Sequence, residues 1–369
     1  MTHLLADYTR HKDNNFNLIR FIAASLVLFS HGFALTGHAE PLSTSLHMTW
    51  GSIAVDIFFI TSGFLITGSY LNRNHLLHFT AARFLRIYPA LLAAIGFCIV
   101  TGAMLTPLSL PDYLANGQTH EFILKNMTLF SGAGFLLPGV FTDLPFPYVV
   151  NASLWTLPYE VWMYAILALL MIMTTMLNRY ISFLSMKRVF LVVASVAIMT
   201  HIVHHFLPAA PAAPASSSAP PVIENFIRMF SMFFAGAALY IWRDKIYLSA
   251  TWLYGGLCVL LLCAFWQQDV FFVIYCLILP LLLLMLAYLP NGRIRSFNRF
   301  GDYSYGIYIY AFPVQQLIAT WLPGVSVPVM AGLSFVLTLM LAMISWHLIE
   351  KKALRMKMNA QPARPLQNT

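Results

Sequence analysis

The chain has 369 residues, of which 59% are hydrophobic and only 9% are charged, and its formal net charge is +8. Soluble domains carry roughly 25% charged residues, so this composition excludes a soluble globular protein and indicates an integral membrane protein. The basic residues cluster beside apolar segments and form no stripe with interleaved aromatic residues. We therefore attribute the positive charge to membrane topology and expect no nucleic-acid partner.

Apolar segments long enough to cross a bilayer recur along the chain. They predict an all-α protein with ten transmembrane helices, near residues 17–36, 50–71, 86–106, 153–177, 189–207, 225–242, 250–266, 270–289, 302–322 and 327–349. A cytoplasmic N-terminus leaves only Lys125 and Arg228 of the basic residues for the outer half, so both termini are expected inside. We predict one membrane domain over residues 1–369, with spans across 17–350 and a short cytoplasmic tail from 351.

The first apolar segment, Leu18 to Thr36, carries two ionisable residues, Arg20 and His31, eleven positions apart. At ~100° per residue they return to nearly the same helix face, about 16 Å apart along the axis. A histidine held in hydrocarbon is costly and by default marks a functional site. The alternative is a histidine at a helix end whose ring is satisfied by a neighbouring carbonyl.

Two connections on the outer side have unusual compositions. Residues 107–152 are rich in Pro and Gly and include a moderately apolar piece, Phe122 to Val140, expected to lie in the interface or dip back into the protein. Residues 208–221 have the composition of an extended, flexible linker. The four cysteines fall in apolar segments with no CxxC pair, so we expect buried thiols and neither a metal site nor a disulfide.

Only two acidic residues, Asp56 and Glu160, fall well inside apolar segments. The predicted topology places both roughly 9–11 Å below the outer surface, in the same layer as His31 and near Arg228. Ionisable groups that converge in one membrane layer indicate a reaction or transport site in the outer leaflet. The alternative is a buried ion-pair network that fixes helix packing.

On the inner side, Arg83 and Arg86 lie three positions apart in ARFLRIYP, immediately before Pro89, and Arg20 is expected at the same boundary. Such a pair either anchors a helix at the cytoplasmic surface or binds phosphates, which arginine contacts with bidentate geometry.

Other segments support these positions. SGFLITG (62–68) supplies small residues where another backbone or a ligand approaches closely. Trp155 and Tyr164 lie near Glu160 at the start of the fourth predicted helix, and together with Arg228 we expect them to bind substrate. GDYSYGIYIYAFP (301–313) is a tyrosine-rich helix start with an acidic residue in its first turn.

In this order, the motifs resemble the membrane acyltransferase-3 family, the O-acetyltransferases of bacterial surface polysaccharides. The resemblance runs from Asn14 to Leu354 and rests on Arg20-x10-His31, DIFFITSGF, RFLRIYP, SLWTLPYE, GDYSYGIYIY and IEKKALR. It implies a protein of the bacterial inner membrane. The implied donor is acetyl-CoA on the cytoplasmic side, and the implied acceptor is a hydroxyl of a glycan, such as an O-antigen, capsule or exopolysaccharide, across the membrane.

The resemblance also implies residue roles. His31 matches the histidine considered catalytic, and Arg20 matches its partner arginine. Arg83 and Arg86 match the pair thought to meet the coenzyme A phosphates, and Glu160 matches the acid of the W-x-L-x-x-E motif.

The chain departs from the family pattern at Ala311, where many members carry a second histidine, so any role of that histidine cannot operate here. Some relatives have a soluble hydrolase-like domain after the last span. About twenty residues follow Glu350, and we expect no such domain in this chain.

The resulting hypothesis makes His31 the general base for the acceptor hydroxyl, an effect of ~10²–10⁴-fold. Either Asp56 or Glu160 would orient the ring, and a route through an acetylated His31 stays open. Alternatives are the same family with peptidoglycan, a lipid-linked sugar or a small molecule as acceptor, or with a succinyl donor. A proton-coupled transporter and a structural scaffold are the other classes considered.

Overall fold

The computed structural model describes residues 3–11, 13–73, 75–181, 184–208 and 222–359. Except for Pro208, the predicted linker 208–221 lies outside the described residues. The described chain is helical apart from one antiparallel pair of two-residue strands, β1 (His3–Leu4) and β2 (Tyr247–Leu248). The predicted all-α class is confirmed.

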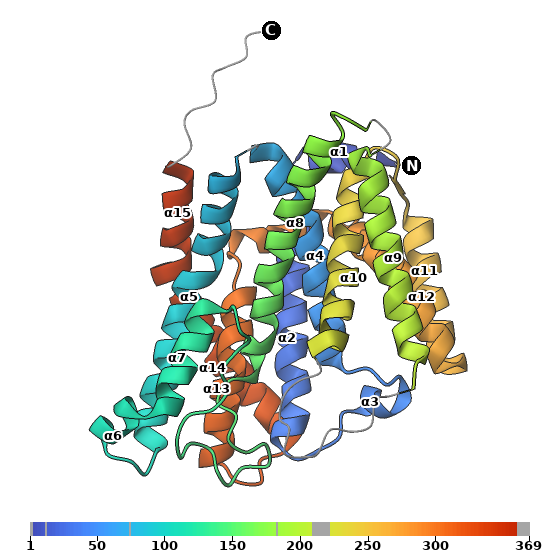
Figure 1. Cartoon of the computed structure of the whole chain (residues 1–369). Helices are drawn as coiled ribbons and strands as arrows, with labels where there is room; N and C mark the ends of the chain where they lie inside the picture. The colour runs from blue at the N-terminus through green and yellow to red at the C-terminus, as the bar shows by residue number, and fades with distance from the viewer. Residues whose placement is uncertain (1–2, 12, 74, 182–183, 209–221, 360–369) are drawn as a thin grey trace. The chain divides into compact units, whose positions relative to one another are not determined.

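Each of the ten predicted segments overlaps a long helix of the structure (Figure 1). These helices are α2 (Phe16–Leu35), α4 (Trp50–Arg73), α5 (Leu76–Leu105), α8 (Leu157–Leu177), α9 (Met186–Phe206), α10 (Val222–Ile241), α11 (Ala250–Trp266), α12 (Gln268–Tyr288), α13 (Ser304–Trp321) and α14 (Val327–Ser345). The shorter elements are α1 (Leu5–Thr9), α3 (Pro41–Ser45), α6 (Leu110–Ala115), α7 (Gly117–Thr128), the 3-10 helices η1 (Ala152–Thr156) and η2 (Gly292–Arg299), the π-helical turn η3 (Trp346–Glu350) and α15 (Lys351–Asn359).

Among the described residues, eight helices are long and apolar enough to cross a membrane. Two of the ten predicted spans are not among them: α11, which has 17 residues, and α13, which carries several tyrosines and two glutamines. Trp252, Phe265 and Trp266 of α11 are 73%, 85% and 79% exposed. Apolar surface of this kind is suited to lipid, and the chain is a multi-pass membrane protein. The span number and the side of each terminus stay predictions.

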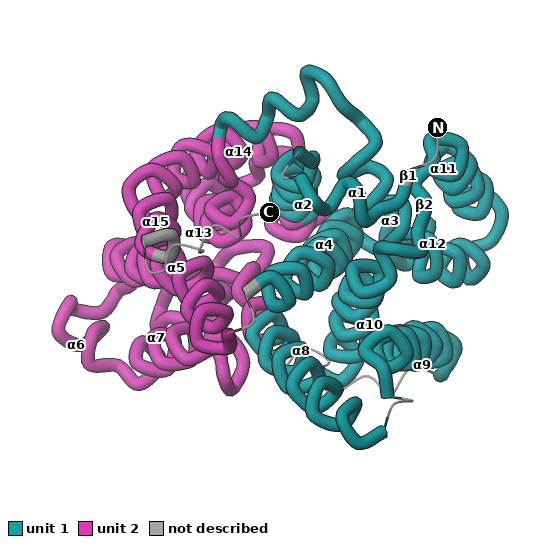
Figure 2. The backbone as a smooth tube through the Cα atoms, turned by 90° about the horizontal axis from the view of Figure 1, so that it is seen from above, with its two compact units in different colours: residues 1–30, 39–72, 159–300 teal, residues 31–38, 73–158, 301–369 magenta. Residues whose placement is uncertain are grey.

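The chain forms two compact units, shown in different colours in Figure 2. Unit 1 comprises Met1–Ser30, Ala39–Asn72 and Tyr159–Phe300, and unit 2 comprises His31–His38, Arg73–Pro158 and Gly301–Thr369. The division falls inside α2, between Ser30 and His31, and at the first turn of α8.

In unit 1, glycines let α4 and α10 approach each other closely. A Cβ atom at Gly63 would overlap the carbonyl oxygen of Phe233, and one at Gly236 would overlap that of Ile60. Small residues permit such contacts between helices in membranes, as the SGFLITG segment predicted. At one end of unit 1, Phe16, Phe64, Tyr240 and the C-terminal half of α12 form an apolar core.

In unit 2, α13 is the central helix, with every residue from Ser304 to Ala319 buried. It packs along α14, where a Cβ atom at Gly306 would overlap Ala342. A helix buried all round needs little lipid-facing apolar surface, so tyrosine, serine and glutamine are tolerated along it when neighbouring groups satisfy them.

The structure corrects one boundary prediction. We expected a membrane span from residue 86, but α5 begins at Leu76 and places Arg83, Arg86 and Pro89 in its interior. Proline frees the carbonyl four residues earlier, a defect that membrane helices tolerate because neighbours satisfy the backbone. Beside this point, Tyr305 Oη donates to the carbonyl of Ile87 at 3.0 Å.

The 107–152 connection is ordered in unit 2. It forms α6 and α7, capped by Ser109 and Asn116, and then an extended segment held by an isolated bridge between Leu136 and Val149. Thr106 Oγ1 donates to the Pro138 carbonyl at 2.7 Å, so the segment is tied to the end of α5.

Candidate active site

The carboxylate of Asp56 on α4 is a densely bonded polar group in unit 1. Arg228 of α10 contacts both of its oxygens, with Nε to Oδ1 at 2.8 Å and Nη2 to Oδ2 at 3.0 Å. Tyr275 of α12 donates its hydroxyl to Oδ2 at 2.8 Å. The Asp56 side chain is 1% exposed, so burial of the charge is offset by a bidentate ion pair and a further hydrogen bond.

The same network reaches a fourth helix, α9, through His201. Its Nδ1 lies 3.1 Å from Ser231 Oγ and 3.8 Å from Cys276 Sγ, and Ser231 donates to the Arg228 carbonyl at 2.8 Å. Sequence reasoning missed His201 and Tyr275. The signal for His201 was available, because it is an ionisable residue inside the apolar segment 189–207.

Glu160 lies in the first turn of α8, also in unit 1. The hydroxyl of Tyr164, one turn later, donates to Glu160 Oε1, and the same hydroxyl lies 3.3 Å from Ser62 Oγ of α4. The predicted proximity of Glu160 and Tyr164 on one face is therefore observed, and Ser62 joins them. Arg20, on α2, places its guanidinium 5.9 Å from the ring centre of Phe58.

His31 is the first residue of unit 2. Its ring packs against that of Phe312 on α13 in a T-shaped arrangement, with centres 5.2 Å apart, and the next residue, Gly32, lies against Gln315 and Met330. The Nδ1 atom of His31 is buried and has no hydrogen-bond partner among the residues that the structure describes. Buried polar atoms without a partner are rare, and at functional sites they await substrate or solvent.

The inner arginine pair, on α5, also lies in unit 2. Arg86 contacts Asp302 at 2.5 Å and Glu350 at 3.5 Å, and its guanidinium lies 5.7 Å from the Tyr305 ring centre. Asp302 precedes α13 and accepts from Ser304, so it lies just before the first turn in which we expected it. Arg86 thus ties α5 to α13 and η3, while Arg83 is half-buried on the same helix.

Trp155 lies in η1 of unit 2 and is half-buried. On either side of it, two residues are bonded to α13: Asn151 Nδ2 donates to the Ile309 carbonyl at 2.8 Å, and Thr156 Oγ1 lies 2.6 Å from Tyr308 Oη. This short helix is therefore held firmly against the central helix.

The structure brings together Asp56 with Arg228 and Glu160 with Tyr164, all in unit 1, whereas His31 belongs to unit 2. The pairing of His31 with either acid stays a prediction. Within the described residues, no group of three or more His, Cys, Asp and Glu is placed to hold a metal ion.

Comparison with known proteins gives the wider relationship. A family profile described as "Acyltransferase domain", of the acyltransferase-3 type, matches residues 13–347. The chain belongs to the acyltransferase-3 family. An "O-acetyl transferase" of Shigella phage Sf6 is 30% identical over 359 residues, which is 93% of this chain and 97% of that protein. "Nodulation protein 10" of Rhizobium leguminosarum bv. viciae is 37% identical over 97 residues, 25% of this chain and 26% of that protein.

No solved structure matches the chain. Membership over almost the whole chain makes this acyltransferase-3 protein an O-acyltransferase, as the motifs predicted.

Proposed function

We propose that this acyltransferase-3 protein transfers an acetyl group from cytoplasmic acetyl-CoA to a hydroxyl of a surface or exported glycan. The relative described as an O-acetyl transferase, which aligns over 97% of its length, supports acetyl as the transferred group. The observation that carries the chemistry is His31, a histidine in an apolar helix whose buried Nδ1 has no partner among the described residues. A group used only for packing would normally be satisfied.

In the proposed reaction, His31 removes the proton of the acceptor hydroxyl as its oxygen attacks the thioester carbonyl. A C–O bond forms, the C–S bond breaks, and the coenzyme A sulfur leaves and takes up a proton. The Phe312 ring holds the imidazole from one side and limits water. The route through an acetylated His31 remains open, and burst kinetics with acetyl-CoA alone separate it from direct transfer.

We assign Glu160 to the reaction as its acidic residue. We assign Asp56 and Arg228 to holding α4 and α10 in position. Both oxygens of Asp56 already have strong partners, and removing either partner would strand a buried charge. The partners of Glu160 are the hydroxyl of Tyr164 and, through it, Ser62. A hydroxyl is neutral, so the hydrogen bonds recorded for Glu160 within the described residues leave its negative charge available to an imidazolium or a substrate.

On the donor side, we assign Arg83 and Arg20 to the coenzyme A phosphates and give Arg86 mainly a structural role. Two carboxylates already surround the Arg86 guanidinium, and a phosphate would compete with them. Arg83→Gln should then raise the apparent KM for acetyl-CoA about tenfold or more, the cost of one charge-assisted hydrogen bond, with little change in the KM for the acceptor. An unchanged KM for acetyl-CoA would remove Arg83 from the donor site.

The decisive experiment compares the surface glycan of isogenic strains with and without the gene, by mass spectrometry and NMR. Acetylation of one sugar position only in the strain with the gene supports the proposal. A succinyl mass difference would keep the site and change the donor, and acylated peptidoglycan would change the acceptor. Solute flux without acetyl-CoA, and no acylated product, would favour the proton-coupled transporter instead.

A further inference from the structure

We infer that the cavity at the C-terminal end of α2 in unit 2 binds the acceptor as an uncharged saccharide segment. The inference rests on the proposed function, because it names the place where the acceptor of that reaction lies. The cavity has a volume of about 760 Å³ and is formed by the end of α2, the 139–145 segment, the end of α13 and the turn before α14. Ligand sites in proteins commonly have volumes of about 300–1,000 Å³.

The cavity lies next to the His31 site along two helices, α2 and α13. Leu35 lines it from α2, one turn after His31 and on the same helix face. Ala319 lines it from α13, two turns after Phe312, whose ring contacts His31. A chain lying in the cavity would therefore run along the helix faces that carry His31 and Phe312.

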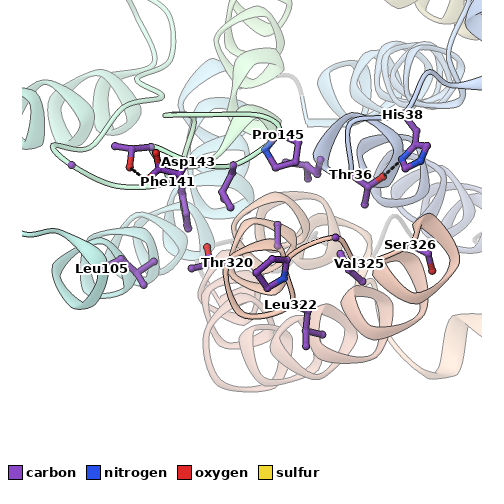
Figure 3. Close-up of a pocket in the computed structure, with 17 residues that line it drawn as sticks. Thr36, His38, Leu105, Phe141, Asp143, Pro145, Thr320, Leu322, Val325 and Ser326 are labelled. Carbon is purple, nitrogen blue, oxygen red and sulfur yellow. Dashed lines mark hydrogen bonds between the residues drawn. The ribbon is translucent and has the colours of Figure 1, made fainter.

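The walls have the chemistry that a sugar needs. Figure 3 shows polar side chains on separate walls: His38 with Thr36 from the turn after α2, Asp143 from the loop, and Thr320 and Ser326 from the α13–α14 region. Between them lie apolar surfaces such as that of Phe141. Sugar hydroxyls require several separated donors and acceptors, while the C–H faces of the ring pack on apolar or aromatic groups.

The same walls disfavour the donor. None of the 17 residues that line the cavity, all of them described by the structure, is Lys or Arg. Phosphates in proteins are bound by such cations, and the exposed carboxylate of Asp143 would repel a polyphosphate. The cavity therefore fits the acceptor and not the nucleotide part of acetyl-CoA.

The loop that forms part of the cavity wall is held in place by hydrogen bonds. Gln316 Nε2 donates to the carbonyls of Phe146 and Val149 at 2.9 and 2.6 Å, which ties the loop to α13. Phe141 adopts a positive φ of 56°, uncommon for a bulky residue and retained only where the surroundings hold it. Its carbonyl accepts from the Tyr148 amide at 2.8 Å.

The first test compares two aspartates that have similar local bonds. Asp143 accepts from Thr142 in the cavity wall, and Asp112, outside the cavity, accepts from Ser109. The probe is the unacetylated oligosaccharide repeat, released by mild acid from the glycan of a strain lacking the gene. Asp143→Asn should weaken its binding to the nanodisc-embedded protein about tenfold or more, measured by saturation-transfer NMR, and Asp112→Asn should leave it unchanged.

The second test blocks the cavity by labelling one position. Thr320→Cys, at the cavity, is matched by Thr128→Cys, since each threonine hydroxyl bonds to the carbonyl four residues earlier in its helix. Both changes are made with Cys258→Ser, because Cys258 is the exposed native cysteine and the other three are buried. A maleimide label at the first position should reduce oligosaccharide binding and acetyl transfer at least tenfold, and the label at the second should not. Acetyl-CoA binding, followed as a thermal shift, should be equal in both.

The outcomes separate the two proposals. Oligosaccharide binding that is lost in Asp143→Asn and in labelled Thr320→Cys supports the cavity, even if the wild-type protein transfers no acetyl group and the proposed function fails. Acetyl transfer that continues unchanged in both variants overturns the cavity assignment and leaves the proposed function in place. Failure of the wild-type protein to bind the oligosaccharide also overturns the cavity assignment.

Discussion

The polar groups around Asp56 in unit 1 and those around His31 in unit 2 differ in how completely they are bonded. Asp56 has Arg228 and Tyr275 on its two oxygens, and the neighbouring His201 has Ser231 at its Nδ1. His31 has an aromatic edge beside its ring and a buried Nδ1 with no partner among the described residues.

The proposed function gives the two regions different roles: the groups around Asp56 hold helices together, and His31 acts on the substrate. The hydrogen-bonded ion pair that joins α4, α10 and α12 stabilises the fold only while each of its members is present. The Nδ1 atom of His31, which has no partner among the described residues, would be costly in a purely structural role, and perturbed groups of this kind cluster at functional sites. Asp56 and His31 are both ionisable residues in apolar helices, so the composition of their segments alone does not distinguish the two roles.

The largest expected effect is that of His31→Gln on catalysis. Acetyl transfer should fall by ~10²–10⁴-fold, the usual contribution of a general base. The unfolding temperature in detergent should stay the same, because Nδ1 has no described hydrogen-bond partner to lose.

His201→Gln is the matched control, a histidine of another apolar helix that does have partners. It should lower the unfolding temperature and retain most of the activity. If His31→Gln kept wild-type transfer at equal protein abundance, His31 would not be the base and the contrast between the two regions would be lost.

The second effect concerns stability. Asp56→Ala leaves the Arg228 guanidinium buried without its carboxylate and should destabilise the protein by about 3–5 kcal/mol. The double variant Asp56→Ala with Arg228→Met should recover much of this loss, because no buried charge remains. Thermal unfolding of the single and double variants measures both. A single variant that is stable but inactive would instead place Asp56 in the reaction.

The sequence predicted the ten helical segments well, because an apolar run of spanning length has few other stable structures. It also identified His31, Asp56 and Glu160, since each interrupts such a run, but it missed His201, which does the same in the segment 189–207. It placed the start of the third predicted span too late, at residue 86, whereas the helix begins at Leu76 and includes Arg83 and Arg86 in its interior. The residues before 86 include several histidines and arginines, and helix boundaries are the least reliable part of a prediction from a single sequence.

The sequence also did not predict which side chain Arg228 would bind. Arg228 was assigned to substrate, and its bond to Asp56, 172 positions away, depends on how α4 and α10 pack at Gly63 and Gly236. The small residues were visible as a pattern, but which helix faces them is set by the whole fold. The same reason hid Tyr275, one tyrosine among 17 in the chain.

The ion cluster at Arg86 offers a third, intermediate case. Arg86→Gln should reduce stability by about 3 kcal/mol, near the lower limit for a broken buried pair, because Asp302 keeps some access to water at 12% exposure. Combining Arg86→Gln with Glu350→Gln should restore part of the lost stability. Unfolding temperature and the KM for acetyl-CoA are measured together, and a change in KM without a change in stability would return Arg86 to the donor site.

The smallest effect compares two tyrosine hydroxyls of the buried regions. Tyr275→Phe removes a bond to the charged Asp56 and should cost about 1.5–3 kcal/mol, whereas Tyr305→Phe removes a bond to the neutral Ile87 carbonyl and should cost about 0.5–1.5 kcal/mol. Both changes delete one oxygen from a buried tyrosine, so the difference in unfolding free energy isolates the charge of the acceptor. Equal losses would mean that Arg228 alone neutralises Asp56, and the network would then be a simple ion pair.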